Sequence, residues 1–92
     1  IDTHGFAIIN RLRASFPQAA SLLMDRETLM AHRNLWGQEP SMDRFAGELS
    51  RLTETEQSLF TDLKYNRLAD GVRLEQERIG FGWLQRKLAH CE

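Results

Sequence analysis

Three carboxylate side chains are the residues of this chain that best suit chemistry on a ligand. Asp2 follows one apolar residue and precedes a helical pattern. A carboxylate between a strand end and a helix points into the crevice where open α/β sheets bind ligands, and Mg2+ often uses only one or two carboxylates. Glu75 and Glu77 would share one face of an extended segment, where paired carboxylates hold a metal or exchange a proton. Asp2, Glu75 and Glu77 are therefore the candidate catalytic residues, with Asp2 the candidate metal ligand.

Each of these residues also has a purely structural interpretation. Asp2 or Thr3 would serve as the N-cap of the helix that follows, and capping is the more common role for such a residue. In residues 73–78, glutamate and arginine side chains would neutralise one another on a solvated surface. The residues by themselves leave both interpretations open.

Other catalytic chemistries lack their motifs in this sequence. His4, His32 and His90 have no second histidine or cysteine at zinc-ligand spacing. There is no nucleophile elbow and no phosphate-binding glycine loop. The single cysteine, Cys91, cannot form an intramolecular disulfide, which favours a reducing compartment. The two tryptophans suit a core or an interface better than the stacking of bases.

Length and composition fit one small globular domain. The 92 residues are 41% hydrophobic and 27% charged, which leaves room for a single core. A formal net charge of -1 gives no broad attraction to nucleic acid or to a membrane surface, so any DNA contact must be local. No apolar run approaches the ~20 residues of a membrane span. We expect a cytoplasmic protein without a membrane partner, and the missing initiator methionine suggests that residues 1–92 are one truncated domain.

The first half of the chain predicts alternating strands and helices. Apolar residues recur at helical spacing over residues 5–16, an apolar run at 20–24 suggests a buried strand, and Asp25 would cap a helix running toward residue 35. If Ile1 closes a strand, this order predicts a helix-rich α/β fold with a short parallel sheet flanked by helices. So small a sheet has an open edge, which predicts a homo-oligomer or further strands.

The second half predicts mostly helices. Residues 36–41 suggest a loop and residues 42–49 a short helix. Thr53 and Glu56 form a capping box for a helix that buries Leu59, Phe60 and Leu63 and fades near residue 66. A turn at residues 70–71 leads to residues 72–79, which are extended or a short helix. The last predicted helix covers residues 80–90, with Phe81, Leu84 and Leu88 on one face.

Four segments of the sequence resemble the C-terminal region of JetD, also called MksG, a subunit of bacterial Wadjet defence systems. They are IDTHGFAIINRLR, SLLMDRETLMAHRNLWGQEP, LTETEQSLFTDL and RLADGVRLEQERIGFGWLQRKLA, of which DTHGF and LEQERI are the most specific. The resemblance implies a partial Toprim-like fold related to the topoisomerase VI A subunit, cutting double-stranded DNA with Mg2+ or Mn2+. It also implies that the protein functions together with an SMC-type ATPase complex that restricts plasmid DNA.

The resemblance also implies a role for Asp2. Toprim domains hold Mg2+ with a glutamate and an Asp-x-Asp pair, and Asp2 matches the second aspartate of that pair. The first aspartate of the pair would be the residue immediately before Ile1. The resemblance thus favours the metal ligand over the simple cap, whereas Glu75 and Glu77 match no Toprim ligand and stay candidate helpers.

We therefore expect part of a metal-dependent DNA endonuclease subunit of an anti-plasmid system. This part should be inactive by itself, because one carboxylate does not fix Mg2+ well. Arg11 and Arg13 would approach phosphate. The alternative is a non-catalytic module in which the helices after Thr53 dock a partner protein.

Overall fold

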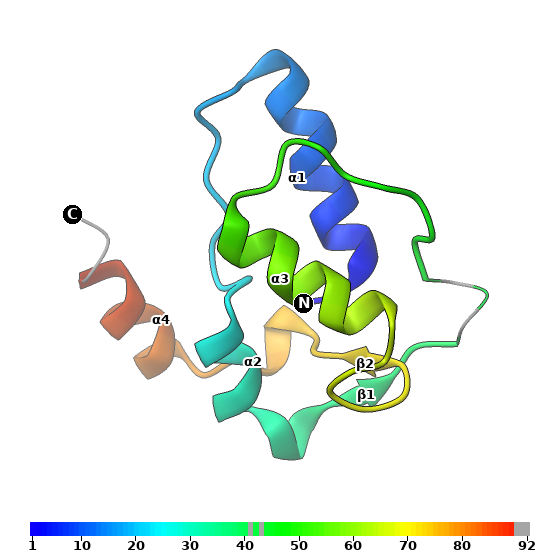
Figure 1. The fold of residues 1–92 in the computed structure, drawn as a ribbon. Coiled ribbons are helices and arrows are strands. Elements are labelled where there is room, and N and C mark those ends of the chain that lie inside the picture. The colour runs from blue at the N-terminus through cyan, green and yellow to red at the C-terminus, as the bar shows by residue number, and fades with distance from the viewer. Residues whose placement is uncertain (41, 43, 90–92) are drawn as a thin grey trace.

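Helices and one small sheet make up the computed structural model, which describes residues 1–40, 42 and 44–89 (Figure 1). The α-helices are α1 (Thr3–Ser15), α2 (Arg26–Ala31), α3 (Glu54–Lys64) and α4 (Phe81–Ala89). The strands are β1 (Gly37–Gln38) and β2 (Val72–Arg73), and two 3-10 turns are η1 (Arg33–Leu35) and η3 (Gln76–Arg78). In this described part, no helix is long and apolar enough to cross a bilayer.

Three helices begin at the caps that the sequence indicates. The Asp2 side chain accepts a hydrogen bond from the Gly5 amide at 2.7 Å, and Asp25 accepts one from the Thr28 amide at 3.0 Å. Thr53 and the glutamate three residues later complete the capping box at the start of α3. Each cap satisfies amide groups that have no partner within the helix, so the predicted helix starts are confirmed.

The sheet is antiparallel, so the predicted parallel sheet is wrong for the described residues. β1 pairs with β2, with Gly37 opposite Arg73 and Gln38 opposite Val72. The predicted strand at residues 20–24 is also wrong, because this run forms bends and irregular chain. Leu23 has a φ of 60°, in the left-handed region that an extended strand excludes. The chain therefore reverses where a central strand was expected.

Ile1 lies beside the residue that follows β2. Its backbone nitrogen donates to the Leu74 carbonyl, and the Leu74 amide donates back to the Ile1 carbonyl at 3.0 Å. One residue pair that exchanges both hydrogen bonds is the closely bonded pair of an antiparallel ladder. Among the described residues, no strand is assigned at Ile1, and the single pair that it forms with Leu74 is antiparallel.

The core lies between α1, α3 and the short sheet. Phe6 of α1 and Phe60 of α3 meet edge to face, with ring centroids 6.1 Å apart. Leu59 and Leu63, also predicted, are buried beside them. The other buried apolar residues are Ile1, Ile9, Leu29, Leu49, Val72 and Leu74.

One buried ion pair crosses from α1 to α3. Nη1 and Nη2 of Arg13 donate to the two carboxylate oxygens of Glu56 at 2.6 and 3.1 Å, and both side chains are 8% exposed. The Ser21 hydroxyl donates to the same carboxylate at 2.7 Å. Arg13 therefore holds the helices and the loop after α1 together, and the expectation that it approaches phosphate is wrong.

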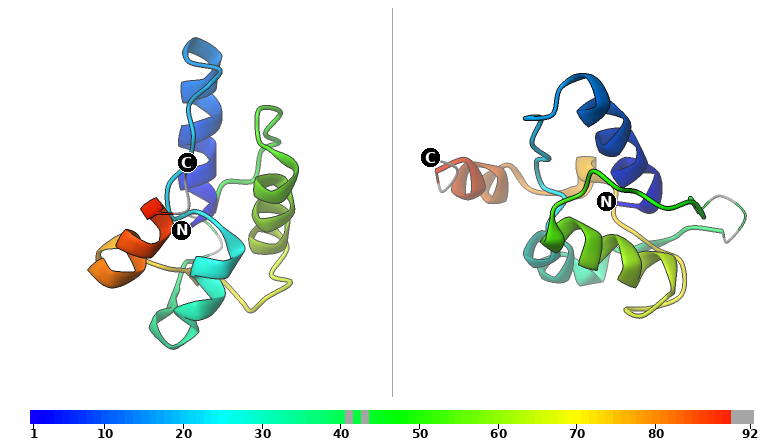
Figure 2. Two further views of the ribbon diagram at one scale, coloured as in Figure 1. Left: turned by 90° about the vertical axis from the view of Figure 1, so that its left-hand side faces the viewer. Right: turned by 45° about the horizontal axis from the view of Figure 1, so that its top comes forward.

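α4 stands at the edge of the molecule, next to α2 (Figure 2). Trp83 Nε1 donates to the Thr28 hydroxyl at 2.9 Å, and Lys87 Nζ lies 2.9 Å from an Asp25 carboxylate oxygen. The predicted last helix is confirmed as α4, and its apolar residues Phe81 and Leu88 are 71% and 52% exposed. The helix packs instead through its half-buried Trp83 side.

Two further predictions concern less regular chain. Residues 44–49 form bends and irregular structure, so that part of the predicted helix over 42–49 is absent, while residues 41 and 43 lie outside the described residues. Residues 72–79 combine both predicted forms, with β2 followed by η3. His90 and Cys91 also lie outside the described residues.

Candidate functional site

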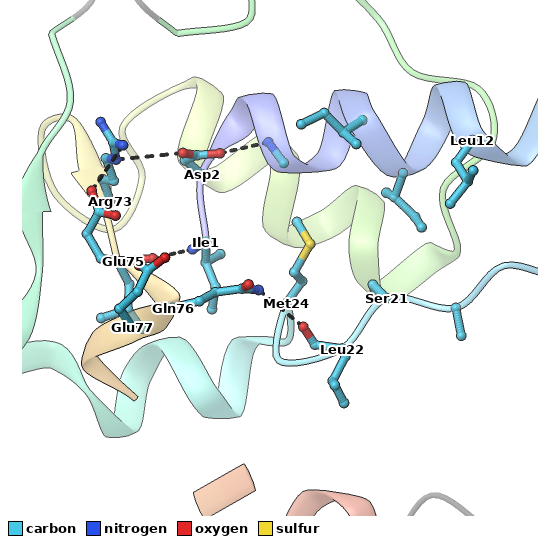
Figure 3. A pocket seen from close by; sticks show the side chains of 15 residues that line it. Ile1, Asp2, Leu12, Ser21, Leu22, Met24, Arg73, Glu75, Gln76 and Glu77 are labelled. Carbon is cyan, nitrogen blue, oxygen red and sulfur yellow. Dashed lines mark hydrogen bonds and ion pairs between the residues drawn. The ribbon is translucent and has the colours of Figure 1, made fainter. Parts of the chain in front are cut away.

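One pocket collects all three predicted carboxylates. It has a volume of about 430 Å3 and is lined by Asp2, Glu75 and Glu77 together with apolar side chains of α1. Figure 3 shows Asp2 and both glutamates at one end and Leu12 at the other. We call this the acidic pocket. Residues 1–2 and residues 73–77 meet here because Ile1 pairs with Leu74.

Asp2 occupies the junction of the extended residue Ile1 and the start of α1. Its backbone is extended, with φ -156° and ψ 175°, as an N-cap residue requires. Oδ1 accepts the Gly5 amide at 2.7 Å, and Oδ2 lies 3.7 Å from Nε of Arg73. The structure therefore confirms the cap. Because the cap uses one oxygen only, the metal role of Asp2 stays a prediction.

Arg73 stands between the two acidic groups. Its Nη2 lies 3.0 Å from Glu75 Oε1, in addition to the longer contact with Asp2. Both Arg73 and Glu75 are exposed, and exposed ion pairs contribute little to stability. This pairing agrees with the predicted neutralisation of glutamate by arginine in residues 73–78.

Glu75 and Glu77 do not share an extended face. The chain turns into η3 at Gln76, and Glu77 belongs to that turn. Both side chains nevertheless line the acidic pocket. Among the described residues, no group of three or more histidine, cysteine, aspartate or glutamate side chains is arranged to hold a metal ion. Any cation here would need water or phosphate oxygens as additional ligands.

Glu39 is a buried carboxylate that the sequence interpretation missed. It is 4% exposed, and its Oε2 has no hydrogen-bond partner among the residues that the structure describes. Burial raises the pKa of Glu39, and the negative charge of Asp2 raises it further, while His4 acts in the opposite direction. The sequence placed Glu39 in a loop, since a two-residue strand leaves no alternating pattern to detect.

Two of the histidines and both tryptophans have structural contacts. His32 Nδ1 lies 2.7 Å from the Thr28 carbonyl oxygen, and its ring meets Trp83 edge to face. The His4 ring meets Phe45 in the same manner, with centroids 6.3 Å apart. Trp36 donates to the Leu29 carbonyl at 2.8 Å. Trp36 and Trp83 therefore pack at internal contacts, as expected.

The chain matches the model of a known protein family. The family described as "Wadjet protein JetD, C-terminal" matches residues 1–88. Comparisons with curated proteins and with solved structures found no match. The family match confirms the predicted resemblance to JetD.

Proposed function

The chain belongs to the C-terminal family of the Wadjet protein JetD, and from this we propose that it forms part of a metal-dependent DNA endonuclease subunit. The family supports a component of a Wadjet defence system. The nuclease, its Toprim-like domain, the Mg2+ or Mn2+ ion and the double-stranded DNA substrate are the proposed refinements. The proposal includes a cytoplasmic location and the subunits of an SMC-type ATPase complex as partners.

The position of Asp2 is the observation that supports this proposal most. Asp2 directly follows the paired residue Ile1, begins α1 and borders the acidic pocket. Its oxygens are hard donors that suit Mg2+ or Mn2+. One oxygen is held by the Gly5 amide, which fixes the direction of the carboxylate. The second oxygen is therefore oriented toward the pocket side on which Arg73 lies.

Each residue of the pocket has a defined task in this proposal. A bound divalent cation would stabilise charge on the scissile phosphodiester and activate the attacking group. Asp2 would hold it through Oδ2. Arg73 would exchange its exposed Glu75 partner for a DNA phosphate, because a guanidinium matches phosphate geometry. Glu75 and Glu77 would accept a proton at the pocket rim.

The test is Asp2→Asn in the protein that contains this chain, assayed for plasmid cleavage with Mg2+ or Mn2+ and its Wadjet partner subunits. Asparagine keeps the oxygen that caps α1 but removes the charge, so folding is retained while cleavage falls at least about tenfold. The matched control is Asp25→Asn, which alters the cap of α2 away from the acidic pocket. Full cleavage by Asp2→Asn would contradict the metal role.

The isolated 92-residue chain gives a complementary test. With supercoiled plasmid and Mg2+ or Mn2+ it should leave the DNA intact, because too few carboxylates reach a common point. Nicking that disappears in Asp2→Ala would show that the expected inactivity is wrong.

A second candidate function, a docking module, is supported by α4. Phe81 and Leu88 lie on an exposed helix face, which is costly to leave in water. A partner protein or a second copy of the chain would cover that face, in line with the expected homo-oligomer. Replacing both residues by serine would weaken assembly in size-exclusion chromatography under this function and leave it unchanged otherwise.

A further inference from the structure

An apolar surface forms the end of the acidic pocket that lies away from the carboxylates (Figure 3). Ile8 and Leu12 stand about one turn apart on α1, line the pocket and are 69% and 43% exposed. The buried residues Phe6 and Ile9 face the core from the same helix. Ile8 and Leu12 therefore form a second apolar stripe on α1, one that is open to water. Exposed apolar surface of this kind marks an interaction site.

The loop after α1 forms the opposite wall of this surface. Leu22 and Met24 line the same pocket, and Leu22 is 45% exposed. The small side chains of Ala20 and Ser21 lie on the same wall. The side-chain amide of Gln76 donates to the Leu22 carbonyl at 3.3 Å, which ties the wall to η3 at the acidic end. We call this region the apolar groove and define it by Ile8, Leu12, Leu22 and Met24.

The acidic end of the pocket has excess negative charge. The carboxylates of Asp2, Glu75 and Glu77 line it together with the guanidinium of Arg73. Arg73 lies 3.7 Å from Asp2 and 3.0 Å from Glu75. Glu77 is exposed and forms no ion pair with any of the residues that the structure describes. Glu77 is therefore the carboxylate of this pocket that an external cation can approach without displacing a protein partner.

We propose that the apolar groove binds an apolar peptide segment of a partner protein, and that an arginine or lysine at one end of the segment pairs with Glu77. Apolar side chains of the segment would cover Ile8 and Leu12, as apolar anchors do when a peptide lies in a groove. The charge at Glu77 would fix the direction of the segment. The inference goes beyond the proposed nuclease function, because it assigns no metal and no DNA contact.

The size of the pocket suits side chains of a single segment. Its volume of about 430 Å3 falls within the range of ~300–1,000 Å3 that is usual for pockets enclosing small ligands. A segment that inserts a few apolar side chains gains the burial of Ile8 and Leu12, which are now in contact with water. The groove therefore needs an apolar occupant, and the acidic end selects one that also carries a positive charge.

The charge of Glu77 distinguishes this occupant from other apolar ligands. A fatty acid carries a carboxylate at its polar end, and like charges repel. A cationic side chain in the same place meets an opposite charge. A basic apolar peptide thus complements both ends of the pocket, whereas a fatty acid complements the apolar groove only.

Fluorescence anisotropy of a labelled synthetic peptide tests the proposal on the 92-residue chain. The peptide carries one arginine followed by leucines at helical spacing. Two comparison peptides replace the arginine by glutamate or the leucines by serine. The first peptide should bind at least about fivefold more tightly than either comparison peptide. The inference would be overturned if the first peptide does not bind, or if the glutamate peptide binds equally well.

Substitutions in the chain locate the bound peptide. Leu12→Gln should weaken binding at least about fivefold, because it removes apolar surface while glutamine still favours a helix. The matched control is Leu88→Gln, since Leu88 is 52% exposed on α4 and lies outside the pocket. A loss of binding in Leu88→Gln but not in Leu12→Gln would place the peptide on α4 and overturn the inference.

A charge reversal tests the pairing with the basic end of the peptide. Glu77→Lys should weaken binding at least about threefold, in keeping with an ion pair at an exposed carboxylate. The matched control is Glu48→Lys, which makes the same change of net charge at an exposed residue outside the pocket. Equal effects of the two substitutions would show that only the net charge matters and would contradict the assigned role of Glu77.

Two measurements do not depend on a substitution in the groove being tolerated. Adding the peptide should shift the NMR signals of the Leu12, Leu22 and Met24 amides more than that of Leu88, and shifts confined to α4 would overturn the inference. Size-exclusion chromatography without peptide tests a second copy of the chain as the occupant. Self-association in which NMR places a second copy against Leu12 and Leu22 would also overturn the inference.

Discussion

Replacing Glu56 by glutamine removes one half of the buried ion pair between α3 and α1. The carboxylate receives two hydrogen bonds from Arg13, at 2.6 and 3.1 Å, and further ones from Ser21 and the Thr53 amide. Removing one partner of a buried pair leaves the other charge uncompensated and costs about 3–5 kcal/mol. We expect Glu56→Gln to lose a free energy of unfolding in this range at neutral pH.

The pKa of Glu56 gives an independent magnitude. Burial by itself raises this pKa, but the hydrogen bonds from Arg13, Thr53 and Ser21 outweigh burial and lower it from 4.5 to about 2. A lowered folded-state pKa stabilises the protein above the unfolded value, and this contribution is lost as the pH falls from 4.5 to about 2. The difference corresponds to on the order of 3 kcal/mol.

Urea unfolding followed by circular dichroism measures both effects. Over the interval from pH 4.5 to about 2, the unaltered chain should lose on the order of 3 kcal/mol more than Glu56→Gln. The matched control is Glu54→Gln, an exposed glutamate in the same first turn of α3. The stabilising role of Glu56 would be refuted by two results together. The free energy of unfolding would show the same pH dependence in the unaltered chain and in Glu56→Gln, and the substitution would cost less than about 1 kcal/mol at neutral pH.

Two further substitutions test the fold around the site. Gly71→Ala places a methyl group 2.4 Å from the Glu39 carbonyl oxygen at a φ of 60°, so unfolding in urea should show a loss of at least about 1 kcal/mol. An unchanged midpoint would contradict the register of β1 and β2. Trp83→Phe removes the hydrogen bond to Thr28, and hydrogen exchange should become faster in α4 than in α1. Equal acceleration in both helices would contradict the attachment of α4 through Trp83.

Local signals in the sequence predicted the starts of α1, α2 and α3 well. Asp25 and Thr53 each precede a helical pattern, and a side chain that caps the next few amides is a short-range interaction. Such contacts depend on adjacent residues only. The start of α1 at Asp2 was predictable for the same reason.

Long-range pairing was not predictable from these patterns. A short apolar run such as residues 20–24 does not distinguish a strand from other buried chain, and the left-handed Leu23 ends the extended conformation there. β1 and β2 have two residues each, too few to show an alternating pattern. The same limit concealed Glu39, whose burial depends on the distant Gly71.

The sequence predicted which residues line the site better than it predicted how they are arranged. The residue types and the resemblance selected Asp2, Glu75 and Glu77, and the structure places all three at the acidic pocket. Their metal and catalytic roles stay predictions. The pairing of Ile1 with Leu74, which brings residues 1–2 beside residues 73–77, has no counterpart in local periodicity.

The close approach of Met24 to α1 gives the acidic pocket walls of unequal stiffness. A Cβ atom at Gly5 would lie 2.9 Å from the terminal methyl of Met24 and 3.3 Å from Asp2 Oδ1. The thioether has three rotatable bonds and can swing aside, whereas the capping oxygen is tethered to a backbone amide. The acidic pocket can therefore widen on the side of Met24 when a group enters, while the Asp2 carboxylate keeps its orientation.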